Sequence, residues 1–98
     1  MIMVDELAVW PGAKRPFHRG SCHLTTDGDL DELHAFAKRL GMRREWFQPH
    51  ILAPHYDLTP ERRAKALQLG AEIVPAREQS KRRRARGIGI GAGLRVLT

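Results

Sequence analysis

The sequence DLDELHAFAKRLG at residues 29–41 predicts the clearest helix of the chain and decides its fold class. Leucine and alanine recur there at the spacing of one helical face, while charged side chains occupy the other faces. Asp29 suits the N-cap, and Gly41 suits the left-handed position after the helix end. We expect this helix to pack a single apolar stripe on a core, formed by Leu30, Leu33, Ala37 and Leu40.

A second helix is predicted to begin after Thr59 as N-cap, with Pro60 in its first turn, and to run to Leu69 before Gly70. A third helix is expected from residue 76 to about residue 86. Because the helices alternate with short strands, we predict a small single α/β domain whose sheet is partly parallel. The three predicted strands are residues 2–4, 21–25 and 71–74.

Length and composition limit the classes of protein that the chain can be. The chain has 98 residues, of which 42% are hydrophobic and 29% charged, as expected for one folded domain with one core. No apolar run approaches the roughly 18 to 20 residues that cross a bilayer, and the first residues lack the pattern of a signal peptide. Cys22 is the single cysteine, so an internal disulfide is excluded. We therefore expect a cytoplasmic protein that does not enter a membrane.

Charge divides the chain into two segments. Residues 1–76 contain ten basic and ten acidic residues, whereas residues 77–98 contain seven basic residues and Glu78 alone on the acidic side. The formal net charge of +6 therefore falls in the second segment, and we predict a globular domain over 1–76 and a basic, Gly-rich tail over 77–98. Arginine clusters bind phosphates, so nucleic acid or another polyanion is the expected partner of this tail, with a solvated tail as the alternative. The residues proposed for this contact are Lys81, Arg82, Arg83, Arg84 and Arg86.

Several motifs together resemble a known family. The segments are 21–27, 32–37, 55–62 and 70–71, with Met3 to Asp5 and the pair Trp10 and Pro11 fitting the same pattern. They resemble the bacterial and phage family called domain of unknown function 4031, over roughly residues 2–78. The helix motif and the His-Tyr-Asp motif are the most specific parts.

This resemblance implies no activity, because the family supplies no catalytic residues that could be carried over. The chain also departs from the family pattern in two places. Residues 49–54 lengthen the approach to His55, and residues 80–98 are unusually basic and rich in glycine. The loop and the tail therefore have no support from the resemblance.

Four residues form the candidate catalytic site. Asp5 ends the first predicted strand, His23 lies in the second, and His55 and Asp57 precede the second helix. A His-x-Asp pair in extended chain places both side chains on the same side. Imidazole and carboxylate groups serve as ligands of zinc, manganese or iron and as general acids and bases. The competing interpretation is structural, with the aspartates capping turns and the histidines hydrogen-bonded at the core edge.

Three functions remain open on the sequence. The first is a small accessory protein that binds nucleic acid or a phosphorylated ligand through its tail. The second is a hydrolase or nucleotide-processing enzyme that uses the His/Asp residues, with a divalent metal as the expected cofactor. The third is a protein–protein interaction module. Convergence of Asp5, His23, His55 and Asp57 in one pocket would favour the enzyme, and their dispersal would favour the other two functions.

Overall fold

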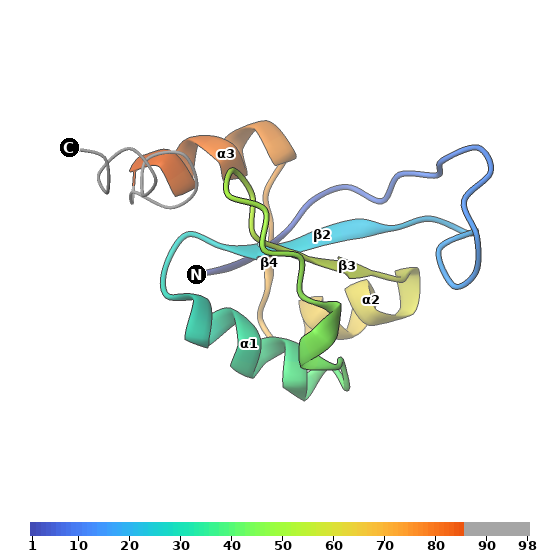
Figure 1. The fold of residues 1–98 in the computed structure, drawn as a ribbon, viewed down its shortest axis with the longest axis horizontal. Helices are drawn as coiled ribbons and strands as arrows, with labels where there is room; N and C mark the ends of the chain where they lie inside the picture. The colour runs from blue at the N-terminus through green and yellow to red at the C-terminus, as the bar shows by residue number, and fades with distance from the viewer. Residues whose placement is uncertain (86–98) are drawn as a thin grey trace.

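The protein folds into a four-stranded mixed sheet with helices on both faces (Figure 1). The structure is a computed structural model that describes residues 1–85. The sheet order is β3-β2-β1-β4, in which β1 and β4 are parallel and the other two pairs are antiparallel. The elements are β1 (Ile2–Val4), β2 (Cys22–Thr26), α1 (Leu30–Arg39), η1 (Arg44–Trp46), β3 (Tyr56–Leu58), α2 (Pro60–Gln68), β4 (Glu72–Ile73) and α3 (Ala76–Ala85).

The α/β class, the three helices and the partly parallel sheet are confirmed, but the prediction of three strands was wrong. The additional strand is β3, which pairs with β2 along its full length. Its sequence, Tyr-Asp-Leu, is only three residues long, so its alternation of apolar and polar side chains is too short to distinguish a strand from extended chain. Pairing with β2, which is distant in sequence, makes it a strand.

Helices α1 and α2 begin where the sequence predicts and end one residue before the predicted last residue, which is the C-cap in each case. The Asp29 side chain accepts a hydrogen bond from the backbone N–H of Asp31, and the Thr59 hydroxyl accepts one from Arg62. Each helix is followed by a glycine with positive φ, +77° at Gly41 and +104° at Gly70, a conformation that other residues rarely adopt. These caps fix the lengths of α1 and α2.

The apolar core lies between the sheet and the helices α1 and α2, which cover one face (Figure 1). Leu33, Ala37 and Leu40 are buried as predicted, and Leu30 is partly buried against the same core. From the sheet, alternate side chains of β2 and β3 face this core, among them Leu24 and Leu58. The remaining side chains of these strands therefore face α3.

Helix α3 covers the opposite face of the sheet (Figure 1). Gln79 of α3 is buried there and accepts a hydrogen bond at 2.6 Å from the hydroxyl of Thr25 in β2. The face of the sheet that α3 covers is therefore polar, whereas the face that α1 and α2 cover is apolar. None of the helices within residues 1–85 has the length and hydropathy needed to span a membrane.

Candidate functional site

Strand register brings three of the candidate residues together on the α3 face of the sheet. His23 in β2 lies directly opposite Asp57 in β3, so their side chains project from the same face. The β1–β2 ladder ends at the pair Val4 and Leu24. Asp5 continues this ladder with its side chain, because Oδ1 accepts the backbone N–H of His23 at 2.7 Å.

Asp5 also fixes the ring of His23. Its second carboxylate oxygen lies 2.7 Å from His23 Nδ1. Asp5 is buried, whereas the His23 side chain is about half exposed. The hydrogen bond to Asp5 raises the pKa of His23, and partial burial opposes this shift. In the neutral ring, the proton on Nδ1 leaves Nε2 with a free lone pair.

His55 is held in the same way by the loop before β3. The backbones of Gln48 and His55 form an isolated antiparallel bridge, which closes the 49–54 loop as a hairpin. Within this hairpin, His55 Nδ1 lies 2.7 Å from the carbonyl oxygen of Ala53. Because a carbonyl oxygen only accepts, Nδ1 carries a proton, and Nε2 is the nitrogen on the side of Asp57.

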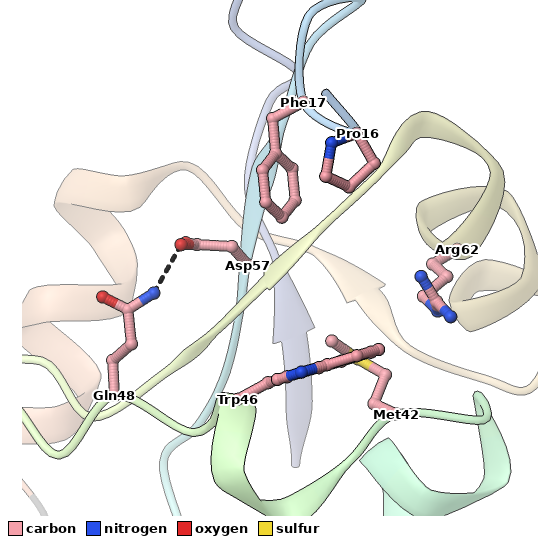
Figure 2. Close-up of a pocket in the computed structure, with 7 residues that line it drawn as sticks. All are labelled: Pro16, Phe17, Met42, Trp46, Gln48, Asp57 and Arg62. Carbon is pink, nitrogen blue, oxygen red and sulfur yellow. Dashed lines mark hydrogen bonds between the residues drawn. The ribbon is translucent and has the colours of Figure 1, made fainter. Parts of the chain in front are cut away.

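Asp57 completes the cluster. Its Oδ1 lies 3.4 Å from His55 Nε2, and its Oδ2 accepts a hydrogen bond from the Gln48 side-chain amide (Figure 2). The hydrogen bond to His55 is the main cause of a lowered Asp57 pKa, with Gln48 contributing in the same direction against partial burial. Asp57 is therefore a carboxylate at neutral pH.

The structure thus brings all four candidate residues into one cluster. The rings of His23 and His55 meet edge to face, with centroids 4.9 Å apart. His23, His55 and Asp57 each offer one ligand atom, and these atoms lie within 4.8 Å of one another, so the three side chains could hold a metal ion together. Asp5 stands behind His23 as a hydrogen-bond partner. The catalytic role of these residues stays a prediction.

Helix α3 forms one wall of a pocket whose other wall includes the two histidines of the cluster. The sequence did not predict this role of α3. Gln79 is fixed by Thr25 and by its own amide, which donates to the Val74 carbonyl at 2.9 Å. One turn later Arg83 is 5% exposed and lines the same pocket of about 210 Å³. Its terminal nitrogens contact the side chains of Gln79 and Ser80, but its Nε has no hydrogen-bond partner among the described residues. Burial lowers the pKa of Arg83.

Of the other tail residues proposed to bind phosphate, three lie away from this pocket and one lies outside the residues that the structure describes. Lys81 and Arg84 are exposed on α3, and Arg82 is partly buried with its guanidinium 3.7 Å from the carboxylate of Glu78. Arg86 lies outside the described residues. Since residues 76–85 form a helix on the sheet, the segment assigned to the tail begins inside α3. The division at residue 76 and the binding of nucleic acid stay predictions.

A second, larger cavity of about 410 Å³ lies beside the cluster (Figure 2). Figure 2 shows Phe17 and Pro16 on one side and Trp46 and Met42 on the other. Asp57 and Gln48 form one end, so Asp57 belongs both to this cavity and to the His/Asp cluster. The cavity is lined by Pro16, Phe17, Met42, Trp46, Gln48, Asp57 and Arg62.

Cys22 takes no part in the site. Its side chain faces the apolar core and is 3% exposed. Burial is the main cause that raises its pKa to about 12, so the thiol stays protonated at neutral pH. A protonated thiol enclosed by the core is not a nucleophile.

The family comparison agrees with the motif resemblance and extends it. The family described as "Protein of unknown function (DUF4031)" matches residues 2–86. The chain belongs to the DUF4031 family. No curated protein and no solved structure gives a significant match to the chain.

The DUF4031 match covers more of the chain than the motifs alone indicated. It runs to residue 86 rather than 78 and therefore includes all of α3. It also spans the 49–54 hairpin that holds His55. Both walls of the pocket thus lie within the DUF4031 domain.

Proposed function

We propose that this DUF4031 domain is a hydrolase that uses one divalent metal ion bound by His23, His55 and Asp57. The observation that carries the proposal is the hydrogen bonding of the two histidines. Each holds its Nδ1 against an oxygen acceptor, which leaves Nε2 as the nitrogen for a metal ion. In His55 this nitrogen lies 3.4 Å from Asp57 Oδ1, where a metal ion would replace the proton between them. Metal-binding histidines in proteins are oriented in this way, by a carboxylate or a backbone carbonyl on the other ring nitrogen.

The donor set indicates the class of metal. Two imidazoles and one carboxylate suit zinc, manganese or iron, whereas calcium and magnesium prefer oxygen ligands alone. Catalytic zinc sites combine three protein ligands with an open position for water. Asp5 and Gln48 act as positioning residues, because they hold His23 and Asp57 without belonging to the ligand set.

Arg83 supports a phosphate ester as the substrate class. Arg83 lines the pocket of His23 and His55, and its hydrogen bonds to Gln79 and Ser80 leave further N–H donors of the guanidinium that can pair with a phosphoryl oxygen. A divalent ion held by His23, His55 and Asp57 would activate a water molecule as the nucleophile near neutral pH. In the hydrolysis the water oxygen would bond to phosphorus, the ester P–O bond would break, and the leaving alkoxide would take up a proton in place of the one that the water gives to solvent, so one water would be consumed.

The other two hypotheses have less support. Arg83 is enclosed in the pocket instead of lying on the surface, and Arg82 is partly buried beside Glu78. In the described part of α3 a polyanion would therefore meet mainly Arg77, Lys81 and Arg84. An interaction module does not need a cluster of histidines and carboxylates. We also propose a cytoplasmic location, where the one cysteine of the chain stays reduced.

The experiment combines metal titration with a hydrolysis assay. Protein stripped with EDTA is titrated calorimetrically with Zn²⁺ and Mn²⁺, and the loaded protein is assayed on 4-nitrophenyl phosphate and bis(4-nitrophenyl) phosphate. We expect one ion per chain and metal-dependent release of nitrophenol. His55→Ala and Asp57→Asn should abolish both, while His18→Ala, on the exposed loop before β2, should change neither.

Thermal melts separate loss of the site from loss of the fold. His55 and Asp57 are only partly buried and lie outside the apolar core, so both variants should melt near the wild-type temperature. Wild-type protein that binds neither metal, or that binds metal equally well after His55→Ala, would overturn the proposal.

A further inference from the structure

The larger cavity has the form of a site for a flat, aromatic ligand. Phe17 and Trp46 face it from opposite sides in Figure 2, and its volume of about 410 Å³ falls in the range of small-molecule sites. Trp46 is held in place by the Arg62 guanidinium, which lies 5.3 Å from the ring centroid. Arg62 is in turn bonded through Nε to the Leu40 carbonyl at 3.4 Å. Trp46 is thus supported by α2.

The polar end of the cavity offers a hydrogen-bond acceptor. Asp57 lines this end, and its carboxylate, which accepts one hydrogen bond from the Gln48 side-chain amide, can accept another from a ligand. A carboxylate oxygen accepts from an amino group or a ring N–H. Nucleobases combine such groups with a flat ring that stacks on tryptophan and phenylalanine.

We propose that the cavity binds the base of a nucleotide whose phosphate lies at the metal-binding cluster. This inference rests on the proposed function and names its substrate class. Asp57 connects the two parts, because it lines the cavity and its Oδ1 lies 3.4 Å from His55 Nε2. A ligand in the cavity therefore lies next to the proposed metal. Arg83, which lines the same pocket as the two histidines, can then bind the phosphate of the nucleotide.

The chain offers a direct test, because it has two tryptophans and only Trp46 lines the cavity. Trp10 is 58% exposed on the loop between β1 and β2. The Trp10→Phe protein, in EDTA, is titrated with the four ribonucleoside 5′-monophosphates and with ribose 5-phosphate, which lacks a base. At least one nucleotide should change Trp46 fluorescence and bind at least tenfold more tightly than ribose 5-phosphate.

Matched variants assign the binding to the cavity. Calorimetry with the best nucleotide should show a loss of affinity of about tenfold or more for Trp46→Ala and for Phe17→Ala, as expected for lost base stacking. Trp10→Ala should bind as the wild type does. Equal affinity for every nucleotide and ribose 5-phosphate, or unchanged affinity in both cavity variants with normal thermal melts, would overturn the inference.

Because nucleotide binding is measured in EDTA, without metal, the experiment tests this inference separately from the proposed hydrolase. Failure of base binding in a protein that binds metal and hydrolyses the nitrophenyl esters overturns the inference alone. Tight nucleotide binding by a protein that binds no metal supports the base site and overturns the hydrolase.

Discussion

Asp5 bonds His23 twice, at the backbone N–H through Oδ1 and at the ring Nδ1 through Oδ2, each at 2.7 Å. The first bond fixes the carboxylate against the end of the β1–β2 ladder, and the second fixes the ring. A carboxylate held in this way selects one tautomer and one orientation of the imidazole. The sheet therefore holds the His23 ring in an orientation in which its Nε2 can bind a metal ion.

The first prediction concerns this pair. Asp5→Asn keeps the shape of the side chain but removes its negative charge, so the His23 ring loses its charged acceptor. We expect zinc affinity, measured by calorimetry, to fall by about 10- to 100-fold, as is typical when a partner of a ligating histidine is removed. Glu6→Gln, which changes the neighbouring exposed residue, should have no effect. Equal affinities of the two variants would contradict the positioning role of Asp5.

The second prediction concerns the fold. Leu33 is fully buried between α1 and the sheet, so Leu33→Ala should lower the free energy of unfolding by about 2–5 kcal/mol through lost burial and the cavity left behind. Lys38→Ala, on the exposed side of the same helix, should change it by less than about 0.5 kcal/mol. Urea unfolding of both variants measures the difference. A stability of Leu33→Ala equal to that of the wild type would contradict the packing described for α1.

The helices could be predicted closely because local signals define them. Asp29 and Gly41 bound α1, and Thr59 with Pro60 begins α2, as their capping chemistry requires. β3 was missed, because a strand of three residues depends on its partner β2 and not on its own pattern. Its residue Asp57 was still selected, since alternation along extended chain places it on the side of His55.

The residues around the cluster were harder to predict for a related reason. Gln48 reaches Asp57 only because the 49–54 hairpin closes. Arg83 was interpreted as a surface residue because it stands among four other basic residues in sequence. Its burial depends on how α3 docks, and Gln79 fixes that docking through Thr25, a contact across 54 positions of the chain. No local pattern encodes such a contact.

The third prediction concerns Arg83. Arg83→Met removes the charge and keeps most of the volume, and the Gln79 amide keeps its bond to Thr25, so the fold should persist. Binding of inorganic phosphate by the metal-loaded protein should weaken by about tenfold or more, the usual effect of losing a charged hydrogen bond. Calorimetric titration measures this change. Arg84→Met, on the exposed side of α3, is the control, and equal phosphate binding by both variants would contradict the role of Arg83.

The fourth prediction concerns Cys22 and pH. Burial raises its pKa from 9.0 to about 12, so between these values the unfolded chain loses the thiol proton while the folded chain retains it. The unfolded state then binds fewer protons, and stability falls as pH rises above about 9. Urea unfolding at pH 8 and pH 10.5 should show a larger loss for the wild type than for Cys22→Ala. Equal losses would contradict the raised pKa.

The central claim is the metal site, and a crystal structure of the protein grown with zinc tests it most directly. Anomalous diffraction at the zinc edge locates the ion without reference to the protein chain. We predict one ion bound by Nε2 of His23, Nε2 of His55 and the Asp57 carboxylate, at about 2.0–2.2 Å from each. A structure from these crystals with no ion between the three side chains, or with zinc bound only at other residues, would contradict the account.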